Sequence, residues 1–155
     1  MRRRLSHPTR SLSALAVAAL LALTPHMAAG QDTITGTTLD GATFEAPAVW
    51  VMGETLLISG EGWTNIPGNI GSVIGVKYDQ GETVPENPVG DLDDVWLEIG
   101  AAADGSWSAE LPFPENAGWA VDEVHSVHLL TGLLGVNDKA RNPVIRVTLV
   151  EADTP

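Results

Sequence analysis

The sequence contains no cysteine. This absence excludes disulfide bonds, thiolate metal sites, a cysteine nucleophile and a lipid anchor on cysteine. Basic residues are also scarce, because the chain has 8 lysines and arginines against 20 acidic residues. Four of the eight lie within the first ten residues, so residues 31–155 carry four basic and 20 acidic residues, a net charge of −16. That charge repels phosphate backbones and anionic membranes, and it excludes a nucleic-acid partner.

No long apolar run follows residue 30, and the run before it is short. Residues 14–23 are apolar without interruption, but ten residues at about 1.5 Å each cannot cross a hydrocarbon core about 30 Å thick. The run follows four arginines and precedes Ala28, Ala29 and Gly30, the small residues that signal peptidase requires. This order predicts a signal peptide over residues 1–30, removed after Gly30. We therefore expect a secreted protein, extracellular or cell-wall associated, with no membrane span once the signal is removed.

The rest of the chain has β-type patterning and no helical periodicity. Residues 31–47 are rich in Thr, Gly and Ala and weakly patterned, which predicts a flexible leader with room for one short edge strand. From residue 48 onward, short alternating runs are separated by Gly, Pro, Asn and Asp. The predicted strands are residues 48–52, 55–60, 72–79, 94–99, 106–111, 123–131 and 143–151. Seven short strands in about a hundred residues predict an all-β, antiparallel sandwich over residues 48–151.

Alternation along the strands assigns their two faces. Val95, Leu97 and Ile99 are expected on the core face, which turns Trp96 outward. Trp107 is expected on the core face of its own strand by the same alternation. The Asp-Gly pair at residues 104–105 lies between these two strands and predicts a tight hairpin, because glycine accepts the positive φ of such turns.

Five stretches of the domain form a recognisable set: SGEGW at residues 59–63, GSVIGVKYDQG at 71–81, VW at 95–96, DGSWSAELP at 104–112 and HSVHLLTG at 125–132. Together they resemble Ig-like β-sandwich modules of actinobacterial secreted and cell-surface proteins. The resemblance covers residues 48–150 and implies an Ig-like fold and a non-catalytic role as a binding or interaction module at or beyond the cell surface. No cofactor is expected, and the expected partner is an unidentified extracellular protein or a glycan. Such modules also occur beside haem-uptake domains, so haem is an alternative ligand that the resemblance implies.

Four side chains are candidate ligand-binding residues. An outward Trp96 suits the face of a pyranose ring, although packing is the competing interpretation. Tyr78, His125 and His128 are candidate haem ligands. The two histidines lie three positions apart in one predicted strand, so they are expected to point to opposite faces and not to share a zinc ion.

The stretch of residues 79–94 is acidic and contains no basic residue. Carboxylate oxygens are the ligands that calcium prefers, which makes Asp79, Asp91, Asp93 and Asp94 candidate metal ligands. The stretch lacks the D-x-D-x-D-G spacing of a known calcium loop. A solvated surface loop is therefore the favoured interpretation of these acids.

Catalytic motifs are missing from the sequence. It contains no G-x-S-x-G elbow, no H-E-x-x-H and no phosphate-binding P-loop. A glycosidase needs a cleft between two carboxylates, and a domain of this length would be unusually small for one. The sequence thus predicts a binding protein rather than an enzyme.

Overall fold

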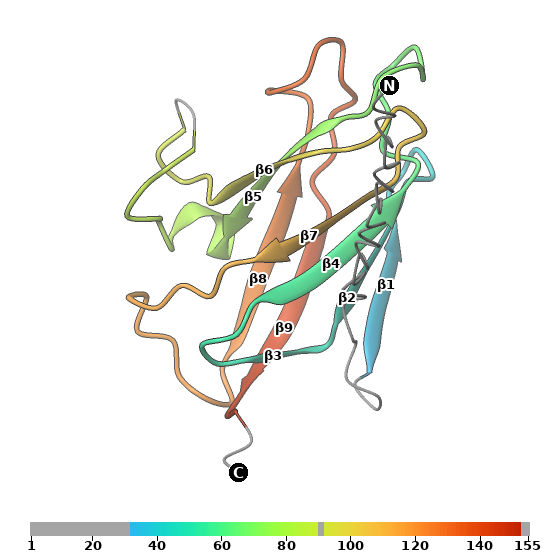
Figure 1. Cartoon of the computed structure of the whole chain (residues 1–155). Helices are drawn as coiled ribbons and strands as arrows, with labels where there is room; N and C mark the ends of the chain where they lie inside the picture. Colours follow the sequence, from blue (N-terminus) through green and yellow to red (C-terminus); the bar gives the residue numbers. More distant parts are fainter. Residues whose placement is uncertain (1–31, 90–91, 153–155) are drawn as a thin grey trace, which may run out of the picture.

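The computed structural model describes residues 32–89 and 92–152 (Figure 1). Within these ranges the chain is all-β, with nine strands in two sheets and a single 3-10 turn, η1 (Asp79–Gly81). The predicted signal peptide, residues 1–30, lies outside the described residues. In the described ranges there is no helix of the length and apolar character that a membrane crossing requires.

The first sheet contains four antiparallel strands in the order β1-β2-β4-β7. These are β1 (Thr33–Thr37), β2 (Thr43–Pro47), β4 (Leu56–Glu61) and β7 (Trp107–Leu111). The β1–β2 hairpin closes with the Thr38 amide donating to the Ala42 carbonyl oxygen at 2.7 Å. Gly41 takes a φ of 90° in this turn, which glycine adopts without strain.

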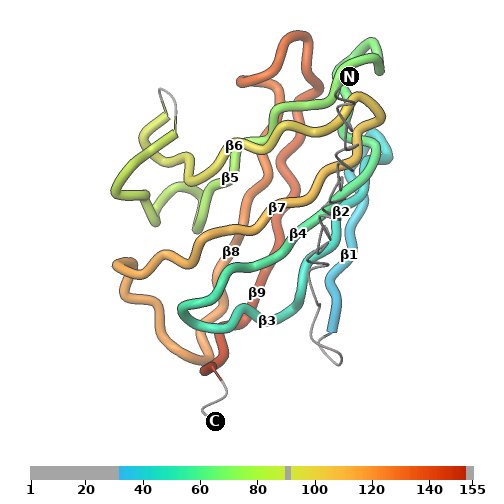
Figure 2. The backbone as a smooth tube through the Cα atoms, in the orientation of Figure 1, coloured from blue at the N-terminus to red at the C-terminus, as the bar shows by residue number. Residues whose placement is uncertain are grey.

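The second sheet contains five strands in the order β3-β9-β8-β5-β6. These are β3 (Val49–Val51), β5 (Val73–Tyr78), β6 (Leu97–Gly100), β8 (Val124–Leu130) and β9 (Val144–Val150). The pairing of β3 with β9 is parallel, and the other neighbours are antiparallel. The chain passes from one sheet to the other five times, between β2 and β3, β3 and β4, β4 and β5, β6 and β7, and β7 and β8 (Figure 2).

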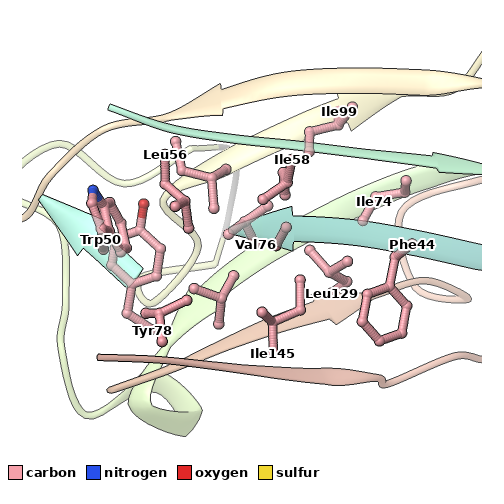
Figure 3. Packing of buried hydrophobic residues seen from close by; sticks show 14 of the residues in the cluster. Phe44, Trp50, Leu56, Ile58, Ile74, Val76, Tyr78, Ile99, Leu129 and Ile145 are labelled. Carbon is pink, nitrogen blue, oxygen red and sulfur yellow. The ribbon is translucent and has the colours of Figure 1, made fainter. Parts of the chain in front are cut away.

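The core lies between the two sheets (Figure 3). Ile58 of the first sheet and Val76 and Leu129 of the second point toward one another there and have no exposed surface. Each fully buried aliphatic side chain of this kind contributes about 1.5–3 kcal/mol through removal of apolar surface from water. The alternation predicted for residues 145–149 is confirmed, since Ile145, Val147 and Leu149 are buried.

All seven predicted strands are present, with ends within three residues of the prediction. A tight turn is present at residues 104–105, where Gly105 has a φ of 84° and its amide donates to the Ala102 carbonyl oxygen at 2.8 Å. The predicted hairpin is wrong, because β6 and β7 belong to different sheets and the turn carries the chain from one sheet to the other. The all-β, two-sheet architecture was therefore readable from the alternation and the turn residues.

The prediction of a flexible leader over residues 31–47 is wrong, because β1 and β2 occupy residues 33–37 and 43–47. Phe44 and Ala46 are buried in the core, and Ile34 packs against it. The register of β2 on β4 places Phe44 opposite Gly60, so the segment completes the first sheet. The compact domain thus begins at β1 rather than at residue 48.

The predicted outward face of Trp96 is also wrong. Trp96 is half-buried and packs against the core, while Val95 is buried outside the core cluster. The Trp96 amide donates to the Val76 carbonyl oxygen at 2.8 Å, although the strand register pairs Val76 with Leu97. Two residues thus face one partner, as at a β-bulge, and the bulge shifts the alternation by one position.

Candidate functional site

Five aromatic side chains pack together at the end of the sandwich where β5 and β7 finish. The ring of Trp50 lies 5.5 Å from Tyr78, 5.7 Å from Phe113 and 5.8 Å from Trp119, each in an edge-on geometry. Trp96 stacks on Tyr78 with the ring centroids 4.7 Å apart. Figure 3 places Trp50 and Tyr78 at one end of the core and Phe44 toward the other. Such contacts add to area burial and make this end of the domain rigid.

The polar atoms of Tyr78 and Trp96 are occupied within the protein. The Tyr78 hydroxyl donates to the Pro112 carbonyl oxygen at 2.8 Å, and the Trp96 indole N–H donates to the Thr83 carbonyl oxygen at 2.7 Å. Tyr78 has no exposed surface, and burial raises the pKa of its hydroxyl far above the usual value. Tyr78 is therefore a structural centre of the cluster, and Trp96 offers ring surface rather than a donor.

A cleft of about 530 Å³ opens beside this cluster. One wall is the segment of residues 82–87 after η1, and the other is the segment of residues 112–117 after β7. Trp96 also lines the cleft, and Phe113 contributes the aromatic ring of the second wall. The Asn116 side chain donates to Glu86 at 2.5 Å, which joins the two walls. The volume is within the range of small-ligand sites in proteins.

The charged groups that line the cleft are all acidic. They are Glu82, Glu86 and Glu115, and the lining contains no lysine or arginine. Across the residues that the structure describes, none of the three forms an ion pair with a basic side chain. Three of the four basic residues in these ranges instead pair with aspartates elsewhere. The cleft therefore has a negative potential, which attracts cations and hydrogen-bond donors.

His125 lies at the edge of the aromatic cluster and is held by two carboxylates. Its ring stacks on Trp119 at 3.8 Å, with Nδ1 at 2.8 Å from Asp79 and Nε2 at 3.2 Å from Glu123. Burial alone would raise the pKa of Asp79, but hydrogen bonds from the Ser126 amide and from His125 outweigh it and lower that pKa. Both ring nitrogens of His125 are thus engaged: Nδ1 joins β8 to η1 through Asp79, and Nε2 contacts Glu123 directly before β8.

The other candidate histidine has a separate environment. His128 is buried, with Nε2 at 3.1 Å from the Ser126 hydroxyl and Nδ1 at 3.4 Å from the Asn142 side-chain oxygen. It shares no acidic partner with His125. The structure therefore brings His125, Tyr78 and Trp96 to one cluster through Trp119 and leaves His128 outside it.

The three candidate calcium ligands that the structure describes, Asp79, Asp93 and Asp94, do not form a metal site. Asp79 is directed to His125, and Asp94 pairs with Lys77 at 2.5 Å. Asp93 is exposed, and Asp91 lies outside the described residues. Within residues 32–89 and 92–152, no three histidine or carboxylate side chains come close enough to hold one metal ion.

Sequence reasoning missed the second wall of the cleft. Phe113 stands between two prolines directly after β7, and Glu115 and Asn116 follow it. The signal that could have indicated this wall is an aromatic residue between two prolines at the end of a strand. The opposite wall lies about thirty residues earlier in the chain, so the sequence does not show that the two walls meet. The chain matches no family model, no curated protein and no solved structure. The chemistry of the cleft is accordingly the guide to its ligand.

Proposed function

We propose that the protein is a secreted, non-catalytic Ig-like module that acts at or beyond the bacterial cell surface. Its partner is a basic segment of an extracellular protein, held in the cleft beside Trp96. The observation that carries this proposal is the lining of the cleft, where two aromatic rings stand beside three carboxylates that have no basic neighbour in the lining. The signal peptide predicted over residues 1–30 supports the extracellular location.

The order of the strands supports an Ig-like topology. In the first sheet, β2-β4-β7 corresponds to strands A, B and E of an Ig domain. In the second sheet, β9-β8-β5-β6 corresponds to strands G, F, C and C′. β1 extends the first sheet by one further edge strand. Ig-like sandwiches commonly bind partners through the segments that connect their strands, which is where the cleft lies.

The lining favours a ligand that brings positive charge and donors. Carboxylates only accept hydrogen bonds, the Trp96 N–H is bound to Thr83, and an Asn116 N–H is bound to Glu86. A lysine ammonium or arginine guanidinium group supplies the missing donors, and it also binds favourably over an aromatic ring. A bare metal ion is disfavoured, because no three acidic or histidine ligands converge in the described ranges.

A glycan is the second candidate, since Trp96 and Phe113 supply ring faces and Asn87 supplies an amide in the same cleft. Sugar hydroxyls need both donors and acceptors, and stacking on aromatic rings is a common way to hold a pyranose. Haem gains no support from the geometry, because Tyr78 is buried and both nitrogens of His125 are engaged.

Calorimetric titration with a tetralysine peptide tests the proposal. The triple variant E82Q/E86Q/E115Q removes the acidic lining and should weaken binding by at least about tenfold, a loss of about 1.4 kcal/mol. The matched control is E45Q/E61Q/E110Q, which changes the net charge equally on exposed positions of the first sheet. This control should retain most of the affinity.

Two results would contradict the proposal. Equal weakening in both triple variants would mean that the peptide responds to overall charge and not to the cleft. Binding of a neutral oligosaccharide that is lost in the Phe113→Ala variant, with no binding of tetralysine, would assign the cleft to a glycan.

A further inference from the structure

The end of the sandwich opposite the cleft carries exposed aliphatic side chains on three neighbouring segments. Residues 38–42, 62–71 and 131–142 connect the strands at this end, where they appear in cyan, green and orange-red (Figure 1). Five side chains, which we call the apolar end, are between 55% and 111% exposed: Leu39, Ile66, Ile70, Leu133 and Val136. Exposed aliphatic residues gathered in one region of a domain mark an interaction surface.

The three segments are fixed to one another by polar contacts. The Ile66 amide donates to the Asn137 carbonyl oxygen at 2.8 Å. Arg141, whose side chain is 2% exposed, donates to Asp40 at 2.7 Å and to the Thr64 carbonyl oxygen at 2.9 Å. The apolar end is therefore preformed, so little entropy is lost when it binds.

The part of the molecule that carries the apolar end also has the least net charge. Residues 62–71 contain no charged side chain. With the neighbouring residues 38–42, 101–106 and 131–142 they hold three acids and two bases, a net charge of −1. The rest of the described chain holds fifteen acids and two bases, a net charge of −13. Two copies of such a molecule repel each other on every approach that brings their acidic parts together.

We propose that the apolar end binds a second copy of the protein, giving a twofold-symmetric dimer with the acidic bodies pointing apart. Leu39 projects fully into solvent beside a groove of about 420 Å³ between residues 37–40 and 139–143. A projecting aliphatic side chain next to a hollow provides the self-complementary pair that a twofold contact requires. A lipid surface fits less well, because no aromatic residue is exposed there and Lys139 and Arg141 are paired with Asp40.

Sedimentation velocity over a range of protein concentrations tests this inference. The protein should pass from monomer to dimer as its concentration rises. Added sodium chloride should strengthen the dimer, because it screens the repulsion between the acidic bodies. The variant L39D/L133D should raise the dissociation constant by at least about tenfold, since a carboxylate would be buried on each side of the contact.

The control variant is V124D/V144D, which adds the same two charges at exposed aliphatic positions on β8 and β9. It should dimerise as the original protein does. A protein that stays monomeric at every concentration and salt level would overturn the inference, as would a dimer that L39D/L133D leaves intact. Monomers that sediment with zwitterionic lipid vesicles would assign the apolar end to a membrane instead. The test is independent of the cleft, so either proposal can fail without the other.

Discussion

The buried guanidinium of Arg141 allows a sharp stability prediction. It makes two hydrogen bonds through Nε and one through Nη2 to Asp40, one to the Ser72 hydroxyl and one to the Thr64 carbonyl oxygen, at 2.7–3.2 Å. It also lies 3.6 Å from Asp138, whose side chain is 1% exposed. These contacts hold together three segments that are distant in the sequence.

The Arg141→Met variant keeps much of the aliphatic stem and removes the charge. Asp138 would then be a buried carboxylate without a counter-charge, and breaking a buried pair in this way costs about 3–5 kcal/mol. Asp138 keeps three donors, the Ser72 hydroxyl and the amides of Val73 and Lys139. Because these donors still compensate the carboxylate in part, we expect a loss of about 3 kcal/mol, near the lower limit.

Urea unfolding followed by tryptophan fluorescence measures this loss. The control is Arg146→Met, since Arg146 is exposed on β9 and its replacement should change stability by no more than about 0.5 kcal/mol. The double variant Asp138→Asn/Arg141→Met should be more stable than Arg141→Met alone, because it removes the uncompensated charge. Equal stability of the Arg141→Met and Arg146→Met variants would refute the reasoning.

Three further predictions concern acid, the core and calcium. The hydrogen bonds from Arg141 hold the pKa of Asp40 well below its usual value. The Asp40 carboxylate therefore stabilises the fold above about pH 4 and stabilises it less as the pH falls further. In the Arg141→Met variant, the free energy of unfolding should depend less on pH in this acid range. In urea unfolding, Trp107→Ala should lower the free energy of unfolding by about 3–5 kcal/mol and Trp96→Ala by about 1–3 kcal/mol, because Trp107 is more deeply buried. Equal losses in the two variants would contradict this order. Millimolar calcium should raise the melting temperature no more than sodium chloride of equal ionic strength does. The reason is that Asp79 is bound to His125 and Asp94 to Lys77. A rise specific to calcium would establish a metal site.

Much of the fold could be predicted because strand patterns are local. Alternating residues such as Ile145, Val147 and Leu149 define one face of a strand from the sequence alone. β1 and β2 were not predicted because they have few inward residues, Ile34, Phe44 and Ala46, and because their place in the sheet is set by the pairing of β2 with β4. The faces of Val95 and Trp96 were reversed because a bulge opposite Val76 shifts the alternation.

The candidate site was less predictable, because it depends on contacts between distant segments. Trp96 was selected as an outward platform, yet its role in the cleft depends on Tyr78 beneath it and on Phe113 beside it. The pairing of Asp79 with His125 spans 46 positions and is invisible to any local pattern. Composition indicated correctly that acids are abundant, but not which of them share a cleft.

The most direct test of binding at the cleft is a two-dimensional ¹H–¹⁵N NMR titration with tetralysine. The five tryptophan indole signals report from different parts of the domain, and a Trp96→Phe variant identifies the Trp96 signal. We predict that the Trp96 signal shifts with saturation, while those of Trp63 and Trp107, whose rings are 5.4 Å apart at the other end of the core, remain in place. Shifts at Trp63 and Trp107 without a shift at Trp96, or no shift at any of the five, would contradict the account.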